Sequence, residues 1–277
     1  MRVGFVGLGD QGLPMARRVV LAGLPTTLWA RRAASLEPFR GTAATVVGSP
    51  RALGAASDVV ATCVFDGTGT REVLFGPDGI LAGMSRGGIV VVHSTIAPEE
   101  IIEIAAVAKE FGVTVLDAPV SGGRAMAEQG RLVALVGGDR AAHDRCLPVL
   151  STYADQVIHV GRVGAGQQVK LINNALMAAQ LGLAADAFEL GGHLGLDPDG
   201  LVLALRQGTG RSYALEVVAR SGSIDVIARG PAAPTLGKDV RLLARTTAGR
   251  VDLQRGPLLR AARAAIELIE SRVPVRP

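Results

Sequence analysis

A glycine-rich hexapeptide near the N-terminus sets the first requirement on any fold of this chain. Gly7-Leu8-Gly9-Asp10-Gln11-Gly12 follows the apolar run Arg2–Val6 directly and opens a segment with helical periodicity. Between a strand and a helix, Gly7 permits a tight turn, Gly9 lets the backbone approach a pyrophosphate, and Gly12 lets the helix pack on the sheet. The anion would rest on the N–H groups at the positive end of that helix. The predicted cofactor-binding residues of this loop are Gly7, Leu8, Gly9, Gln11 and Gly12.

Up to Gly161 the chain alternates short apolar runs with amphipathic stretches, which is typical of βαβ units and a mostly parallel sheet. Val59–Val64 and Ile89–Val92 are continuously apolar, as expected of strands whose two faces are both covered. Helices are expected at Gly12–Ala22, Pro98–Phe111 and Ala141–Thr152. The predicted strands are Arg2–Val6, Thr26–Trp29, Asp58–Val64, Gly88–His93, Thr114–Leu116, Leu132–Val136 and Gln156–His159.

After Gly161 the pattern indicates helices alone. The segment Gln167–Leu194 has no proline and no strand pattern, which indicates a long helix. Its part Asn174–Gly192 is apolar on nearly all sides, which indicates that the helix is buried. We expect a second copy of the chain to cover part of it, in a homodimer or homotetramer; burial within one chain is the alternative. Further helices are expected at Asp197–Gln207, Ser212–Ala219, Gly237–Ala248 and Gly256–Val273.

These patterns predict an α/β protein with two domains. Residues 1–161 are expected to form a Rossmann-type domain with a doubly wound, mostly parallel sheet. Residues 162–277 are expected to form an all-α domain for substrate binding and dimerisation, joined to the first domain by a long helix.

The residues after the second predicted strand bear on the choice of cofactor. NAD-specific sites place Asp or Glu there, about 20 residues after the glycine loop, to hold the ribose hydroxyls. Here Arg31 and Arg32 occupy this position, and no carboxylate occurs between Asp10 and Glu37. Two guanidinium groups can bind a 2′-phosphate through charge-assisted hydrogen bonds. We therefore predict NADP as the cofactor, with NAD less favoured, and Arg32 has a second interpretation as a solvated surface residue.

Composition and charge argue against several kinds of partner. The formal net charge is +4, but the arginines are scattered and aromatic residues make up only 3%, which favours anionic small molecules over nucleic acid. We expect no membrane span and no signal peptide, and the cysteines, Cys63 and Cys146, suit a reducing cytoplasm. His143, His159 and His193 are expected at the surface or at strand ends, and no histidine spacing predicts a metal site.

Three segments together resemble one enzyme family. Val6–Met15 (VGLGDQGLPM), Asp117–Gly123 (DAPVSGG) and Gly164–Asn174 (GAGQQVKLINN) resemble the β-hydroxyacid dehydrogenases, which include 3-hydroxyisobutyrate dehydrogenase and tartronate semialdehyde reductase. STIAP at 94–98 and GKDV at 237–240 follow in matching order. The resemblance implies hydride transfer between a nicotinamide cofactor and a small 3-hydroxy acid or its semialdehyde acid. It does not indicate which acid; Arg211-Ser212-Tyr213 are candidates for lining the substrate pocket.

Lys170 and Asn174 share one face of the long predicted helix because they are four residues apart, and Gly166 leaves space on that face. The resemblance makes Lys170 the catalytic residue, as general base in oxidation and general acid in reduction. It gives Asn174 a hydrogen bond to the substrate. A lysine in a partly dry cleft has a lowered pKa and can exchange a proton near neutral pH.

Other segments supply candidate contacts to the substrate and the cofactor. Ser121-Gly122-Gly123 follows a predicted strand, and its hydroxyl and N–H groups can bind a carboxylate. The resemblance assigns Thr95 to the nicotinamide ribose, Val64 and Phe65 to a backbone segment that passes the cofactor, and Lys238 to a further cofactor contact. A structural ion pair at a helix start is the alternative for Lys238.

Three other functions are compatible with the same scaffold. One is imine reduction, and another is a catalytically silent cofactor-binding module that recognises a partner. In both related groups the catalytic lysine is usually replaced, so Lys170 counts against them. A 6-phosphosugar acid substrate is the third, but that related enzyme has a much longer helical region.

Overall fold

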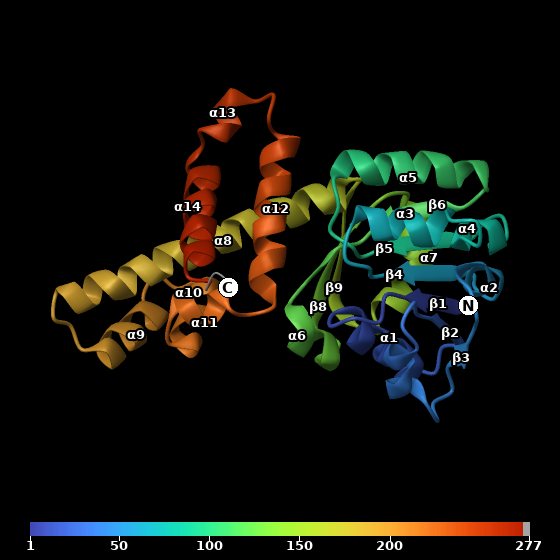
Figure 1. The fold of residues 1–277 in the computed structure, drawn as a ribbon, viewed down its shortest axis with the longest axis horizontal. Coiled ribbons are helices and arrows are strands. Elements are labelled where there is room, and N and C mark those ends of the chain that lie inside the picture. The colour runs from blue at the N-terminus through green and yellow to red at the C-terminus, as the bar shows by residue number, and fades with distance from the viewer. Residues whose placement is uncertain (274–277) are drawn as a thin grey trace. The chain divides into compact units, whose positions relative to one another are not determined.

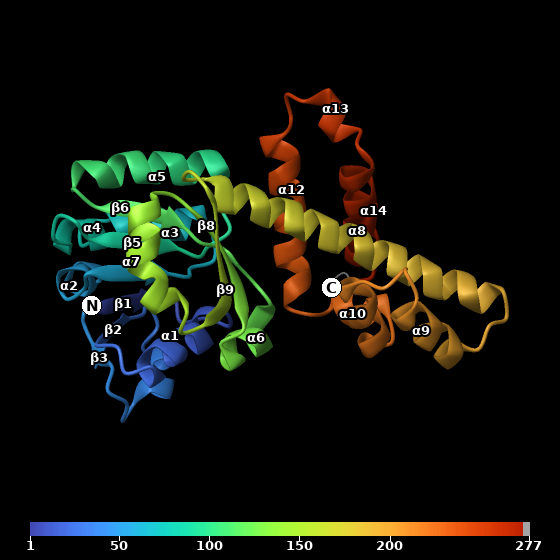
Figure 2. The ribbon, with the colours of Figure 1, turned by 180° about the vertical axis from the view of Figure 1, so that it is seen from behind.

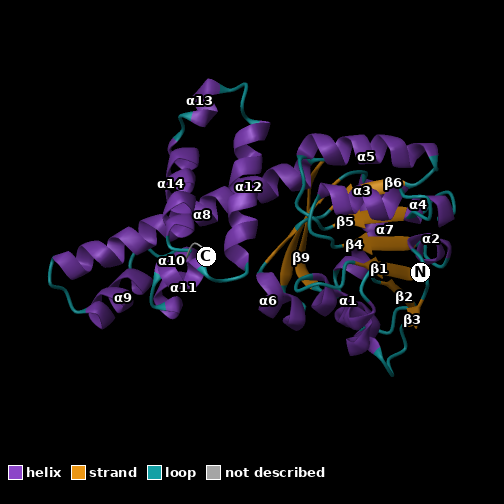
Figure 3. Ribbon diagram, viewed as in Figure 1, coloured by secondary structure: helices purple, strands orange, loops and turns teal. Residues whose placement is uncertain are grey.

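The computed structural model describes residues 1–273 and divides the chain into two compact units, Met1–Lys170 and a second unit that starts at Leu171 (Figure 1). All strands among residues 1–273 lie in the first unit, and the described part of the second unit is helical (Figure 3). The division falls within the long helix α8 (Ala165–His193), whereas the predicted domain boundary lies at residue 161, before this helix begins.

Within residues 1–273, nine strands form one sheet in the order β3-β2-β1-β4-β5-β6-β8-β7, and β9 pairs with β8. The neighbours from β3 to β6 are parallel, β8 is antiparallel to β6 and β7, and β9 is parallel to β8. The strands are β1 (Val3–Val6), β2 (Thr26–Trp29), β3 (Thr45–Val46), β4 (Val59–Thr62), β5 (Ile89–Val92), β6 (Thr114–Asp117), β7 (Val120–Ser121), β8 (Leu132–Gly137) and β9 (Ala154–Gly161).

Helices cover both faces of this sheet, as Figures 1 and 2 show from opposite sides. Side chains of β5 alternate between two cores: Ile89 and Val91 pack in a cluster with residues of α1 and α7, and Val90 and Val92 pack with residues of α2 to α5. The helical segments of this unit are α1 (Gly12–Leu21), the 3-10 helix η1 (Ala33–Phe39), α2 (Pro50–Ala55), α3 (Gly67–Phe75), α4 (Ile80–Gly83), α5 (Pro98–Glu110), α6 (Gly123–Gln129) and α7 (Arg140–Leu150).

The strand order reverses between β1 and β4. The chain runs from β1 through β2 to β3 in one direction, then crosses to β4 and continues through β5 to β6 in the other. In open α/β sheets, ligands bind beyond the carboxyl ends of the strands at such a switch point. The fold therefore directs attention to the loops that follow β1, β2, β4, β5 and β6.

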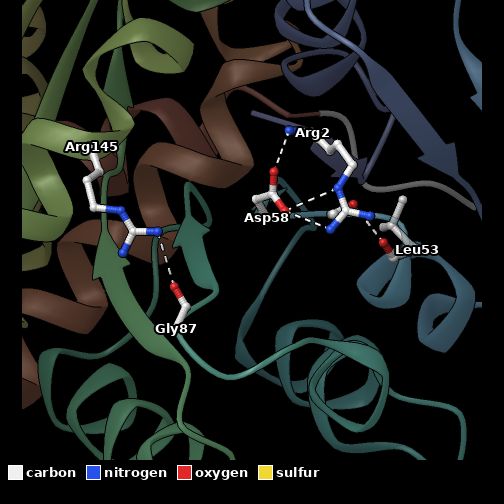
Figure 4. Close-up of polar contacts among 6 residues, drawn as sticks. Arg2, Leu53, Asp58, Gly87 and Arg145 are labelled. Carbon is white, nitrogen blue, oxygen red and sulfur yellow. Dashed lines mark hydrogen bonds and ion pairs between the residues drawn. The ribbon is translucent and has the colours of Figure 1, made fainter.

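At the opposite edge of the sheet, where the parallel strands begin, polar contacts join the strand starts to neighbouring segments (Figure 4). A guanidinium nitrogen of Arg2 lies 2.7 Å from a carboxylate oxygen of Asp58, and the Arg2 backbone N–H donates to the same carboxylate at 2.8 Å. Arg145 donates to the Gly87 carbonyl at 3.2 Å. These contacts tie the starts of β1, β4 and β5 to their neighbours, on the side opposite the expected ligand site.

The second unit packs α12 and α14 with the later part of α8. Gly182 of α8 permits a close approach, since a Cβ atom there would lie 2.7 Å from the Cβ of Ala265 on α14. Among residues 1–273, no helix is both long and apolar enough to cross a bilayer. The helices of this unit that follow α8 are α9 (Pro198–Gln207), α10 (Tyr213–Ser221), α11 (Ile224–Ala228), α12 (Ala232–Thr246), α13 (Val251–Gln254) and α14 (Pro257–Ser271).

The fold class expected from the sequence is confirmed: a mostly parallel Rossmann-type sheet is followed by a helical region, and α8 joins them. β3 and β7 were not predicted, because each contains only two residues and offers no periodicity to detect.

Candidate active site

The glycine loop after β1 is packed tightly at two positions and open at a third. Gly7 has a φ of 91°, and a Cβ atom there would collide with the carbonyl group of Cys63. A Cβ atom at Gly12 would collide with the carbonyl oxygen of Gly7. A Cβ atom at Gly9 would meet nothing within 4 Å. The loop therefore needs glycine at Gly7 and Gly12 for its own packing, whereas Gly9 presents bare backbone to its surroundings.

This loop fits the pyrophosphate of a dinucleotide. It leads into α1, whose first turn has no acidic side chain to repel an anion, and the side chain of Gln11 makes no capping hydrogen bond. Leu8 is buried in the core below the loop and holds it against the sheet. An anion at this helix start would meet backbone N–H groups and the positive end of the helix dipole.

Two arginines and one glutamate occupy the region after β2. The side chain of Arg31 is 85% exposed, and Arg32 is also exposed. A guanidinium nitrogen of Arg31 lies 4.0 Å from a carboxylate oxygen of Glu72 on α3. The sequence near Arg31 does not indicate this glutamate, because α3 lies far from β2 along the chain. The arrangement leaves both guanidinium groups accessible to a phosphate, with one negative charge beside Arg31.

The loops after β4 and β5 hold three further predicted residues. Val64 is half-buried, Phe65 is 70% exposed, and Thr95 is half-buried. Asp66 follows Phe65 and caps α3 by accepting a hydrogen bond of 2.8 Å from the Gly69 N–H. Val64, Phe65 and Thr95 thus follow two neighbouring strands at their carboxyl ends, beside the switch point.

The segment Ser121-Gly122-Gly123 runs from the last residue of β7 to the first residue of α6. Gly122 and Gly123 have φ values of 130° and 68°, which favour glycine, and Ser121 is half-buried. Arg124, the next residue, donates a hydrogen bond of 3.0 Å to Asp10 of the glycine loop. The structure thereby brings the predicted substrate segment next to the predicted pyrophosphate loop, 114 residues away in sequence.

A buried carboxylate anchors the start of α8. Asp117, at the end of β6, is fully buried and accepts hydrogen bonds of 2.8 Å from the backbone N–H groups of Gly164 and Gln167. Burial raises the pKa of Asp117, and the backbone hydrogen bonds act in the opposite direction. A Cβ atom at Gly166 would collide with the Leu135 carbonyl. The expectation of open space at Gly166 is therefore wrong: the sheet fills it.

Gln167 connects the same turn of α8 to the β5 loop. Its Oε1 accepts a hydrogen bond of 3.1 Å from the Ile96 N–H, and its Nε2 donates one of 2.9 Å to the Ser94 carbonyl. Lys170 follows three residues later and is half-buried. The first turns of α8, with Lys170, are thus fixed to the carboxyl ends of β5 and β6. Asp117 and Gln167 lie within the motifs DAPVSGG and GAGQQVKLINN, but neither residue was predicted to have a role.

In the second unit, three polar side chains gather on α8 and α12. Asn174 donates a hydrogen bond of 2.7 Å to the carboxylate of Asp239, which is fully buried. The Lys238 ammonium group lies 3.3 Å from the other oxygen of that carboxylate. Asn174 and Lys238, predicted separately, therefore share Asp239 as a neighbour. Arg211, Ser212 and Tyr213 precede or begin α10, where Ser212 caps the helix through the Leu215 N–H.

Two histidines of the first unit, His93 and His143, are buried. His93 is buried after β5; its Nδ1 lies 2.6 Å from the Ala118 carbonyl oxygen, and its Nε2 lies 3.1 Å from the Tyr153 hydroxyl. His143, expected at the surface or a strand end, is buried on α7, and its Nδ1 lies 2.8 Å from the Asp144 carboxylate. The expectation for His143 is wrong because this residue lies on the buried face of α7.

Both parts of the chain match models of NAD-binding domains from dehydrogenases. The model of the NAD-binding domain of 6-phosphogluconate dehydrogenase matches residues 2–161. The model of the NAD-binding domain of NADP-dependent 3-hydroxyisobutyrate dehydrogenase matches residues 164–272. With the Rossmann-type sheet and its glycine loop, these matches make the chain a nicotinamide-dependent oxidoreductase.

Individual relatives narrow this class. The chain is 34% identical to 2-(hydroxymethyl)glutarate dehydrogenase of Eubacterium barkeri over 216 residues, which are 78% of this chain and 72% of that protein. It is similar to the structure of Mycobacterium tuberculosis 3-hydroxyisobutyrate dehydrogenase with L-serine, with a TM-score of 0.85, 29% identity, and coverage of 97% and 94% of the two chains. Psf3 in complex with NADP+ and 2-OPP matches with a TM-score of 0.82, 28% identity, and the same coverage. The chain belongs to the β-hydroxyacid dehydrogenase family and is an NAD(P)-dependent hydroxyacid dehydrogenase.

Proposed function

We propose that the protein transfers a hydride between NADP(H) and a small 3-hydroxy acid or its semialdehyde acid, with Lys170 as the general acid and base. The position of Lys170 is the observation that carries this proposal. Lys170 is half-buried on the second turn of α8, and that helix start is held to the carboxyl ends of β5 and β6 by Asp117 and Gln167. Ligands of doubly wound sheets bind at this edge.

The cofactor would be held mainly by the loops of the first unit. The open backbone at Gly9 and the start of α1 suit the pyrophosphate, and the exposed guanidinium groups of Arg31 and Arg32 suit a 2′-phosphate. Thr95 would contact the nicotinamide ribose, Val64 and Phe65 would pass along the cofactor, and Lys238 would add a contact. The nicotinamide, when bound, supplies or accepts the hydride.

The substrate contacts follow from the chemistry of an acid. The N–H groups of Gly122 and Gly123, with the Ser121 hydroxyl, would bind its carboxylate. Lys170 would remove the proton from the substrate hydroxyl during oxidation and return it to the carbonyl oxygen during reduction. Asn174, one helical turn further along α8, would donate a hydrogen bond that fixes the substrate oxygen.

The decisive test is a substrate panel with a lysine variant. The purified protein is offered 3-hydroxyisobutyrate, L-serine and 2-(hydroxymethyl)glutarate with NADP and with NAD, and absorbance of reduced nicotinamide reports turnover. We expect turnover of at least one acid, faster with NADP, and a loss of about 10²–10⁴-fold in kcat for Lys170→Ala. Lys109→Ala, an exposed lysine on α5, is the matched control and should keep full activity.

Other outcomes would favour the other functions. Reduction of cyclic imines without turnover of any acid would indicate an imine reductase. Tight NADPH binding without any turnover would indicate a silent binding module. Full activity of Lys170→Ala would remove the lysine from the mechanism while leaving the enzyme class intact.

We further propose that a second copy of the chain covers an apolar stripe on α8. Ile172, Leu176, Leu183 and Leu190 are 47% to 61% exposed, and their spacing places them along one side of the helix. Leu194, just beyond the helix, is 67% exposed and extends the stripe. Large exposed apolar side chains along one side of a helix suit an interface with another protein surface.

The oligomeric state can be measured by light scattering on a size-exclusion column. We expect a dimer or tetramer for the unaltered protein and a shift to monomer for Leu183→Glu. Leu21→Glu, the same change at a 75% exposed position on α1, should keep the assembly. A monomeric unaltered protein would refute the proposal.

A further inference from the structure

The side chain of Gln167 makes two hydrogen bonds to the loop after β5, one to the residue before Thr95 and one to the residue after it. It accepts a hydrogen bond from the Ile96 N–H at 3.1 Å and donates one to the Ser94 carbonyl at 2.9 Å. The residue between these two backbone groups is Thr95. Gln167 is fully buried, so water does not compete for these bonds.

The backbone of Gln167 is fixed independently. Its N–H donates to the buried Asp117 carboxylate at 2.8 Å, beside the bond from Gly164 to the same carboxylate. The residue therefore cannot shift along the helix axis without breaking contacts to β6. One residue thus joins the ends of β5 and β6 to the first turn of α8.

Lys170 lies three residues further along the same helix. Three residues correspond to a rise of about 4.5 Å, and residues at this spacing are neighbours on the helix surface. Because a helix moves as a rigid body over one turn, the position of Gln167 determines the position of the Lys170 backbone. Gln167 thereby sets the separation between the β5 loop at Thr95 and the helix turn at Lys170.

An amide is well suited to this role among the amino-acid side chains. One end must accept from an N–H group and the other must donate to a carbonyl group, and both partners are buried. Methionine has a similar length but would leave both buried backbone groups without these hydrogen bonds, which is unfavourable. Glutamate would keep the acceptor and, when ionised, lose the donor.

We infer that Gln167 is a positioning residue for the reaction, one that acts through Lys170 by fixing it relative to Thr95. This inference rests on the proposed role of Lys170 as the acid and base. It predicts that removing the amide slows the proton transfer while the cofactor still binds. A displacement of about 1 Å in a catalytic group can cost about 10²-fold in rate.

The test compares kcat, the acid's KM and the NADPH dissociation constant in Gln167→Met. We expect kcat to fall about 10–100-fold, with the dissociation constant of NADPH within about threefold of the unaltered protein. Gln168→Met is the matched control: the neighbouring glutamine is exposed, so this variant should keep kcat. A role in stability alone would lower the melting temperature and the amount of active enzyme, without changing kcat per bound NADPH.

A double-mutant cycle with Lys170→Ala separates the possible failures. If Gln167 acts through Lys170, the double variant should be no slower than Lys170→Ala alone. An additional 10-fold loss in the double variant would overturn the inference and leave the function of Lys170 intact. Full activity of Lys170→Ala would overturn both. Should Gln167→Met fail to fold, Gln167→Glu, which keeps the acceptor for Ile96, takes its place in the cycle with the same expected outcomes.

Discussion

The hydroxyl of Tyr153 lies 3.1 Å from Nε2 of His93, and both side chains are buried beneath the β5 loop. The Ala118 carbonyl oxygen, 2.6 Å from Nδ1, can only accept a hydrogen bond, so Nδ1 carries the proton. Nε2 then accepts from the tyrosine hydroxyl. The histidine is therefore neutral in the folded protein, which agrees with a pKa lowered by burial from 6.5 to about 4.

This buried histidine makes stability depend on pH. Between pH 6.5 and 4 the unfolded chain binds a proton at His93 that the folded chain does not. The free energy of unfolding should therefore decrease as the pH falls through this window, by about 1.4 kcal/mol per pH unit from this group. Above pH 6.5 the contribution is complete. Urea denaturation at several pH values measures the slope.

The variant His93→Asn isolates the effect, because asparagine does not titrate and its amide can still donate towards Ala118. Its stability should fall less steeply between pH 6.5 and 4 than that of the unaltered protein. His193→Asn is the control, since His193 is exposed on α8 and its removal should leave the slope unchanged. Equal slopes for the unaltered protein and His93→Asn would contradict the prediction.

Gly9→Ala should separate cofactor binding from folding. A methyl group at Gly9 meets nothing within 4 Å in the protein, so the melting temperature should stay within about 2 °C. The same methyl group would stand where the pyrophosphate approaches, so the dissociation constant of NADPH should rise at least about 10-fold. Thermal denaturation and fluorescence titration measure the two quantities. A variant that binds NADPH normally would place the pyrophosphate elsewhere.

Arg31→Glu should reverse the preference between the two cofactors. Removing a charge-assisted hydrogen bond and adding a negative charge should raise the dissociation constant of NADPH about 10–100-fold. NADH, which lacks the 2′-phosphate, should bind about as well as before. Arg17→Glu makes the same change of charge on an exposed residue of α1 and should leave the ratio unaltered. Equal losses for NADPH and NADH would count against a phosphate contact.

Glu72→Gln should change NADPH binding in the opposite direction from Arg31→Glu. The Glu72 carboxylate lies 4.0 Å from the Arg31 guanidinium, where it would compete with the proposed 2′-phosphate for Arg31 and repel it. Both side chains are well exposed, so the effect should be modest, with NADPH binding about 2–5-fold tighter. NADH titration provides the reference, and a weaker NADPH complex would show that Glu72 supports Arg31 instead of competing with it.

The main elements could be predicted because their patterns are strong. β4 and β5 are apolar except for Thr62, and α8 has no proline over 29 residues, so length and composition identify them without tertiary information. The glycine loop could be placed because a strand and a helix flank it. β7 could not, because its two residues become a strand only by pairing with β8.

The parts of the site that were missed depend on contacts between distant residues. Gln167 resembles any polar residue on a helix until Ser94 and Ile96, 73 and 71 residues earlier, are brought beside it. Asp117 is easier to recognise in the sequence, because it ends an apolar strand. A buried carboxylate there is strongly destabilised by desolvation unless hydrogen-bond donors lie beside it. Glu72 lies near Arg31 only because the fold places α3 beside the residues that follow β2.

The contact between Gly7 and the Cys63 carbonyl limits which residues of the proposed cofactor site can be exchanged. The turn at Gly7 is enclosed by main-chain atoms that have no rotamers to change, so a larger residue there would force the ends of β1 and β4 apart. Arg31 and Glu72, in contrast, face solvent and can be exchanged without moving the sheet. Engineering of the coenzyme choice should therefore start with the exposed charges after β2, and the glycine turn should be left as it is.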